Sequence, residues 1–142
     1  MAEESDPHAL VAAARDVARI ETEATAGLWP RAAALLTRQA LEAAMARLWA
    51  ATAPGLERTS GRCQVLCVGT LLGDPDLGGR VTLAWNVLSE ACHHRVYRLP
   101  PTASELERAF EAAWDLAEAT EALACEAAER RGRLPPRAEG LP

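Results

Sequence analysis

The sequence contains no lysine, and aromatic residues make up only 4% of it. All fifteen basic residues are therefore arginines, which we attribute to the codon composition of a GC-rich genome and to no particular function. β-Branched and aromatic residues, which favour strands, are few, and alanine and leucine supply most of the apolar content. Because alanine and leucine favour helices, this composition predicts an all-α protein.

The chain also lacks a long apolar run. The longest run covers residues 65–72, is interrupted by Gly69 and is too short to cross a membrane. The amino terminus is acidic and no apolar segment follows it, so we expect no signal peptide. The net charge of -5 argues against a uniformly basic surface of the kind that binds nucleic acid. We therefore expect a cytoplasmic protein with no membrane attachment, whose four cysteines are reduced thiols.

Apolar residues spaced three and four apart predict five helices in a single helical-bundle domain, residues 1–131. The predicted helices span residues 7–26, 29–52, 61–72, 76–95 and 103–131. Short connections between amphipathic helices favour antiparallel neighbours. We therefore expect an up-and-down antiparallel helical bundle of four long helices plus one short helix. Residues 132–142 contain three prolines and no periodicity, which predicts a disordered tail.

Each of the longer helices carries an apolar stripe that we expect to face the core. In the second helix the stripe consists of Leu41, Met45, Leu48 and Thr52, widened by Leu35, Leu36 and Trp49. In the fourth helix it consists of Leu77, Val81, Ala84, Leu88 and Ala91. In the fifth helix it consists of Leu106, Phe110, Ala113, Ala117, Thr120 and Ala124.

Polar residues mark two of the helix starts. Asp6 suits the N-cap of the first helix, because its side chain can accept a backbone N–H of the first turn. Thr102 and Glu105 form a capping box before the fifth helix, where each side chain can satisfy an unpaired amide of the other. Gly78 and Gly79 weaken the first turn of the fourth helix by about 1 kcal/mol each relative to alanine.

Candidate functional residues gather near the end of the fourth predicted helix. His93 and His94 are adjacent imidazoles, and Glu90 lies four residues before His94, within reach of an ion pair or an orienting hydrogen bond. We take these three as candidate catalytic residues, since titratable imidazoles in a polar stripe suit a general acid–base or anion site. Candidate binding residues on this face or just beyond it are Asn86, Ser89, Arg95, Tyr97 and Arg98. Alternatively, the histidines simply lie favourably near the negative end of the helix dipole.

The cysteines raise the question of a metal site. Cys63 and Cys67 share a face of the third helix, and Cys92 with His93 could complete a set of four ligands. Structural zinc sites, however, usually place their cysteine pairs in turns, where the chain can wrap around the ion. Buried free cysteine behaves as a small apolar residue. We therefore interpret Cys63, Cys67 and the isolated Cys125 as core thiols, and we expect neither a metal nor a cofactor.

Two of the four tryptophans suggest an interface. Trp85 and Trp114 each follow an inward-facing alanine, so each lies at the edge of its core stripe. Tryptophan in such positions is typical of interface anchors. Five helices in a chain of this size can bury only part of their apolar surface. We predict a homodimer or a hetero-complex with another protein, with the fourth helix close to the interface; alternatively, both rings cap the monomer core.

The order of these motifs carries a family resemblance. An alanine-rich helix containing Arg38-Gln-Ala-Leu-Glu42 is followed, after a helical stretch, by a helix ending in His-His. The loop Leu99-Pro-Pro-Thr-Ala-Ser-Glu-Leu106 then leads into a long helix. Over residues 32–119 this pattern resembles the HEPN superfamily of small helical bundles, in particular its DUF4145-like branch. In that branch an Arg-Asn-x-x-x-His motif precedes a loop rich in proline and threonine.

The resemblance implies a metal-independent ribonuclease of toxin–antitoxin, CRISPR or abortive-infection systems, whose arginine and histidine meet across a dimer. With His94 as the family histidine, the arginine position is Ser89 and the asparagine position is Glu90; with His93, the arginine position is Leu88. In neither of these two alignments does an arginine occupy the arginine position of the motif. That arginine would bind the phosphate and stabilise the transition state. We therefore expect a non-catalytic bundle that binds a partner protein or RNA in a bacterial defence, toxin–antitoxin or stress-response system.

Two alternatives stay open at this point. An active ribonuclease could use His93 or His94, with Arg95 or Arg98 in place of the missing arginine. A purely structural helical subunit could instead complete a larger assembly through its apolar faces. The acidic net charge argues against RNA as the main partner.

Overall fold

A computed structural model describes residues 5–20, 27–93 and 99–133 of the chain. These residues form five α-helices and a short 3-10 helix, with no strand among them, which confirms the predicted all-α class. The elements are α1 (Pro7–Arg19), α2 (Trp29–Thr52), η1 (Leu56–Arg58), α3 (Gly61–Leu72), α4 (Pro75–Cys92) and α5 (Ala103–Arg133). Over the described ranges, no helix is both long enough and apolar enough to cross a membrane.

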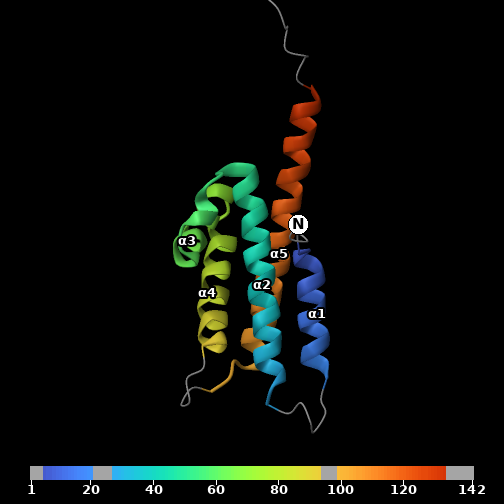
Figure 1. Ribbon diagram of the computed structural model, residues 1–142, viewed down its shortest axis with the longest axis vertical. Coiled ribbons are helices and arrows are strands. Elements are labelled where there is room, and N and C mark those ends of the chain that lie inside the picture. Colours follow the sequence, from blue (N-terminus) through green and yellow to red (C-terminus); the bar gives the residue numbers. More distant parts are fainter. Residues whose placement is uncertain (1–4, 21–26, 94–98, 134–142) are drawn as a thin grey trace, which may run out of the picture.

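The helices pack around α2. The helices α1, α2, α4 and α5 lie along the long axis of the molecule, and the short α3 lies beside one end of α4 (Figure 1). Helix α2 contacts all four other α-helices, and α5 also contacts α1 and α4. Several residues of α2 are fully buried alanines, which let neighbouring backbones approach closely. They are Ala33, Ala34, Ala40 and Ala44.

The predicted core stripes are largely confirmed. In α2 the buried members are Leu41, Met45, Leu48 and Trp49, whereas Leu35 and Thr52 are exposed. In α4 the buried members are Leu77, Val81, Ala84 and Leu88. In α5 burial runs from Leu106 to Thr120, but Ala124 is exposed. The reason is visible in Figure 1, where the C-terminal end of α5 extends beyond the other helices.

The predicted end of the first helix is wrong. Helix α1 ends at Arg19, and Ile20 has an extended backbone and a half-exposed side chain. The next three residues, Glu21 to Glu23, offer no large apolar side chain that would continue the buried stripe. Residues 21–26 lie outside the described part of the chain. With 13 residues, α1 is almost as short as α3 with 12, which differs from the expected four long helices and one short helix.

Helix α5 ends slightly later than predicted. It continues to Arg133, so Gly132 and Arg133, which were expected in the tail, are helical. Three arginines, at positions 130, 131 and 133, occupy its last turn, where positive charge interacts favourably with the helix dipole. The rest of the predicted tail, residues 134–142, lies outside the described residues.

The predicted caps are present. The side chain of Asp6 accepts the N–H of His8 at 3.2 Å. Glu105 Oε2 accepts the N–H of Thr102 at 2.8 Å, and Thr102 Oγ1 accepts the N–H of Glu105 at 3.2 Å, which completes the capping box. Helix α4 begins with Pro75, one residue before the predicted start. Asp74 caps it, because its side chain accepts the N–H of Leu77 at 3.0 Å.

Helices α3 and α4 cross at two glycines. A Cβ atom on Gly78 would lie 2.5 Å from the Cα of Gly69, a distance that real Cβ atoms do not reach. The neighbouring Gly79 is exposed, and a Cβ there would meet no atom within 4 Å. Of the two adjacent glycines in α4, Gly78 is therefore required by the packing and Gly79 is not.

This difference predicts opposite effects of two substitutions. Gly78→Ala should lower the free energy of unfolding by about 2 kcal/mol, because the added methyl forces the α3 and α4 backbones apart. Gly79→Ala should raise it by about 0.5–1 kcal/mol, because alanine loses less backbone entropy in a helix. Urea denaturation followed by circular dichroism measures both. Equal effects of the two substitutions would contradict the close crossing.

Candidate functional site

The structure places only part of the predicted site. Helix α4 ends at Cys92, not at Arg95 as predicted, and His93 follows it with an extended backbone (φ -87°, ψ 118°). His93 is exposed; its backbone N–H donates to the carbonyl oxygen of Ser89 at 3.2 Å, but its imidazole has no hydrogen-bond or ion-pair partner within the described ranges. Four further candidates lie outside those ranges: His94, Arg95, Tyr97 and Arg98.

The remaining candidates do not form one stripe. Ser89 is half-buried and lines a hollow between α2, α3 and α4. Glu90 lines a different hollow, on the side of α4 that faces the start of α5. Asn86 is exposed and lines neither of these two hollows. The polar face that the helical spacing predicts is therefore divided between two flanks of α4.

Trp85 closes the hollow next to Ser89. The exposed fraction of Trp85 is 9%, and the guanidinium of Arg38 lies 4.8 Å from its ring centroid. Arg38 also pairs with Glu42 at 3.2 Å. A Cβ atom on Gly61 would lie 2.5 Å from the ring, so α3 begins directly against it. Most of the Trp85 ring is thus covered within the monomer, and the exposed apolar side chain on α4 is Leu83.

Leu83 lies on a groove between α4 and α5. The groove has a volume of about 310 Å³, and its apolar lining consists of Leu83, Ala84, Val87 and Ala109. The exposed fraction of Leu83 is 68%. The charged residues along the groove are Arg80, Glu105, Arg108 and Glu111. Single exposed leucines are ordinary, but an exposed leucine that continues an apolar groove with charged edges is typical of a protein-binding surface.

The groove continues along the same pair of helices. A second hollow of about 280 Å³ shares Val87 and Glu105 with the first and extends to Pro100 and Pro101. The strongly exposed Leu99 lies at its far end. Together, the two hollows form a surface that we call the α4–α5 groove. It runs from Arg80 and Arg108 at one end to Leu99 at the other.

Ion pairs and caps hold the sides of the α4–α5 groove. Arg80 donates to Asp115 at 2.7 Å across the two helices, and to Asp76 at 3.3 Å within α4. The hydrogen bond to Asp115 is the main reason why the pKa of Arg80 is raised. The pKa of Glu105 is lowered, chiefly because its carboxylate accepts the backbone N–H of Thr102. The charged residues on this surface are therefore partly fixed in place.

The cysteine prediction is partly wrong. Cys63 and Cys125 are exposed, and Cys67 and Cys92 are half-buried, so none of them is a fully buried core thiol. The prediction fails because Cys63 lies in the first turn of α3, next to solvent, and Cys125 lies after Thr120, the last buried residue of α5. In the described part of the chain, no three of Cys63, Cys67, Cys92 and His93 bring their ligand atoms together.

The described residues that do come together are ones that the sequence interpretation missed. His8, at the start of α1, lies against Glu118 and Glu121 of α5. The i, i+3 spacing of the two glutamates was visible in the sequence, but their pairing with a histidine 110 residues away was not. Trp114, the other predicted interface residue, is half-buried and packs its ring edge-to-face with His8 at a centroid distance of 4.5 Å.

Three kinds of comparison with known proteins found no match. No protein-family model, no curated protein and no solved structure matches the chain.

The capping box next to the groove gives a further prediction. Thr102→Ala should lower the free energy of unfolding by about 1 kcal/mol at neutral pH, because an N–H of the first turn of α5 loses its acceptor. Thr102 Oγ1 also donates to Glu105 Oε2 at 3.0 Å, so part of the difference should disappear as the pH falls through the lowered pKa of Glu105, since a protonated carboxyl accepts poorly. Ser104→Ala is the control, because the hydroxyl of Ser104 makes no hydrogen bond among the described residues. Equal losses from both substitutions, measured by urea denaturation, would contradict the cap.

Proposed function

We propose that the chain is a non-catalytic, HEPN-like up-and-down helical bundle that acts by binding protein through the α4–α5 groove. One observation carries the proposal: an exposed apolar side chain, Leu83, continues a groove that is lined by apolar residues and edged with charges of both signs. The resemblance over residues 32–119 suggests a setting in bacterial defence, toxin–antitoxin or stress response. A structural subunit of a larger assembly would use the same surface.

A second copy of this chain is the partner that the charges favour. A two-fold interface places the same surface on both sides, so its charges must be self-complementary. Arg108 and Glu111 are one turn apart on α5, and Glu111 has no ion-pair partner in the described ranges. In a two-fold arrangement each arginine can face a glutamate of the other copy, while the Leu83 side chains meet in the centre. The net charge of -5 on each copy opposes association, and such local pairing offsets part of this repulsion.

The arrangement around His93 supports a binding role over catalysis. Neither histidine frame keeps the motif arginine, and His93 is exposed, with no described side chain to orient it. Glu90, which was expected to act with the histidines, lines the α4–α5 groove and not the hollow next to Ser89.

Self-association gives the first test. Light scattering at micromolar concentration should report about twice the monomer mass of 15.2 kDa. Leu83→Glu should return the protein to the monomer mass, because it places a carboxylate in the centre of the interface. Leu66→Glu is the matched control, because Leu66 on α3 is equally exposed, at 65%, but lies outside the groove.

Charge reversal sharpens this test. The variants Arg108→Glu and Glu111→Arg should each associate poorly with themselves, and a mixture of the two should associate better than either alone. A wild-type monomer at every concentration, or equal effects of Leu83→Glu and Leu66→Glu, would disprove a dimer through this groove. Recovery of a different protein by pull-down, lost with Leu83→Glu, would replace the second copy by a hetero-partner.

RNA cleavage tests the runner-up function. Incubation of the purified protein with total RNA should leave the RNA intact, because the arginine that would stabilise the transition state is missing. Loss of such a preorganised cation typically lowers the rate by about two to three orders of magnitude. Gel electrophoresis over a time course measures this. Cleavage that disappears with His93→Ala or His94→Ala would establish an active ribonuclease instead.

A further inference from the structure

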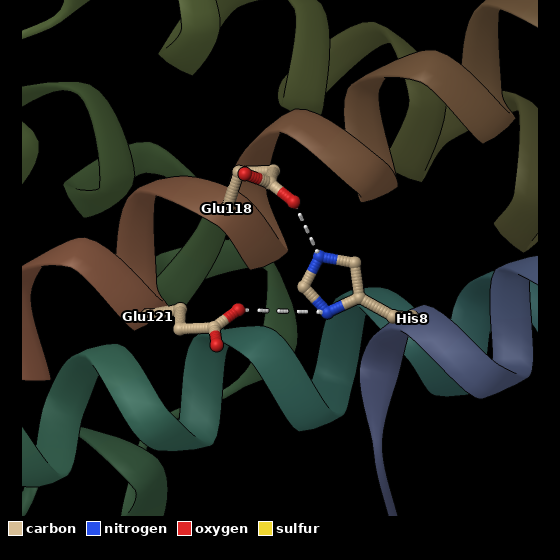
Figure 2. A group of neighbouring side chains, drawn as sticks. All are labelled: His8, Glu118 and Glu121. Carbon is tan, nitrogen blue, oxygen red and sulfur yellow. Dashed lines mark hydrogen bonds and ion pairs between the residues drawn. The ribbon is translucent and has the colours of Figure 1, made fainter.

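A second cluster of polar side chains lies away from the α4–α5 groove. It joins the start of α1 to the middle of α5, where Glu118 and Glu121 are one turn apart (Figure 2). His8 Nε2 lies 3.0 Å from Glu118 Oε1, and His8 Nδ1 lies 4.0 Å from Glu121 Oε2. One ligand atom from each of the three residues can be chosen so that all lie within 4.8 Å of one another. No other group of this kind occurs in residues 5–20, 27–93 and 99–133.

The imidazole is held in position by its surroundings. The backbone N–H of His8 donates to the capping side chain of Asp6 at 3.2 Å, which fixes the start of α1. The edge-to-face packing against Trp114 has an interplanar angle of 82°, and the exposed fraction of the His8 side chain is 18%. His8 Nδ1 is also 3.7 Å from Asp6 Oδ1. A ring fixed by packing and by a neighbouring carboxylate loses little entropy when it binds a ligand.

The charges around this imidazole are strongly negative. Three carboxylates surround it, those of Asp6, Glu118 and Glu121. The guanidinium of Arg47 lies 3.8 Å from Asp6, but no arginine of the described residues lies within ion-pair distance of the two glutamates. Like charges one turn apart on a helix repel each other. A divalent cation would offset this repulsion more fully than one imidazole does.

We propose that His8, Glu118 and Glu121 form a binding site for a divalent transition-metal ion of the zinc type. One imidazole nitrogen and two carboxylate oxygens are ligands that zinc accepts, with the fourth position open to water. In a tetrahedral site the ligand atoms are about 3.4 Å apart, as follows from zinc–ligand distances of roughly 2.1 Å. The two glutamates contact different ring nitrogens, so one of them must move to the nitrogen that binds the ion; both side chains are mostly exposed, at 61% and 64%, which leaves them room to move. Without metal, His8 keeps its direct contact with Glu118.

The position of the site gives metal binding a structural consequence. The ligands come from α1 and α5, and His8 is separated from Glu118 by 110 residues. The unfolded chain does not hold these groups together, so a bound ion stabilises the folded state. It would fasten the start of α1 to α5 at the level where α5 leaves the bundle.

Zinc titration tests the proposal directly. Isothermal titration calorimetry of the full chain, purified without a histidine tag, should show one zinc ion bound per chain. His8→Ala and Glu121→Gln should each weaken binding at least tenfold, because each removes one of three ligands. His93→Ala is the matched histidine control, since His93 is exposed and lies outside the cluster. Cys63→Ser controls for zinc bound by the cysteines of α3.

Three results would overturn the site. They are no binding up to millimolar zinc, binding that His8→Ala and Glu121→Gln leave unchanged, and binding that only Cys63→Ser removes. Cobalt(II) gives an independent readout, because thiolate ligands add an intense charge-transfer band that a histidine–carboxylate site lacks. If His8→Ala loses helicity by circular dichroism, the near-isosteric variants Glu118→Gln and Glu121→Gln decide the outcome.

Discussion

The burial of α2 between its neighbours is the constraint on which the rest of the fold depends. Its alanines let adjacent helices approach closely, and the indole of Trp49 fills the end of the core. The one polar atom of that ring donates to Gln64 Oε1 at 2.8 Å. The amide nitrogen of Gln64 in turn donates to the carbonyl oxygens of Glu57 and Thr59. The fully buried Trp49 is therefore connected through Gln64 to η1 and to the start of α3. Helix α3 in turn determines how closely α4 can pack, because the two helices cross at Gly69 and Gly78.

The parts of the fold that local chemistry determines were predictable from the sequence. Helices α2 and α3 begin and end at the predicted residues. Helix α2 ends just before Pro54 and Gly55, and helix α3 ends at Gly73, which has a positive φ angle. The capping box of Thr102 and Glu105 forms as its residue types indicate. The end of α1 was not predictable in this way. Position 20 is an isoleucine, so neither a glycine nor a proline marks the end of this helix.

The candidate site was harder to predict than the fold, because side chains meet through packing and not through sequence spacing. Helical periodicity placed Ser89 and Glu90 on one polar face, yet adjacent residues are turned by about 100° and reach different neighbours. The outward position of Leu83 depends on where α5 lies. His8 and Glu118 are 110 residues apart, so no local pattern could pair them. The α4–α5 groove and the cluster around His8 also differ in chemistry. The groove is apolar with charges of both signs at its edges, whereas the cluster consists of carboxylates around one imidazole.

The projecting end of α5 has a consequence for its dynamics. After Leu123, the last residue of α5 that packs against the core, the helix continues for about 15 Å, at 1.5 Å per residue, and its C-terminal end extends beyond the other described helices. An isolated helix of this length is marginally stable in water. The amide protons of one continuous helix will therefore exchange with solvent by two routes. Those near Phe110 wait for global unfolding, and those near Cys125 exchange whenever the last turns fray.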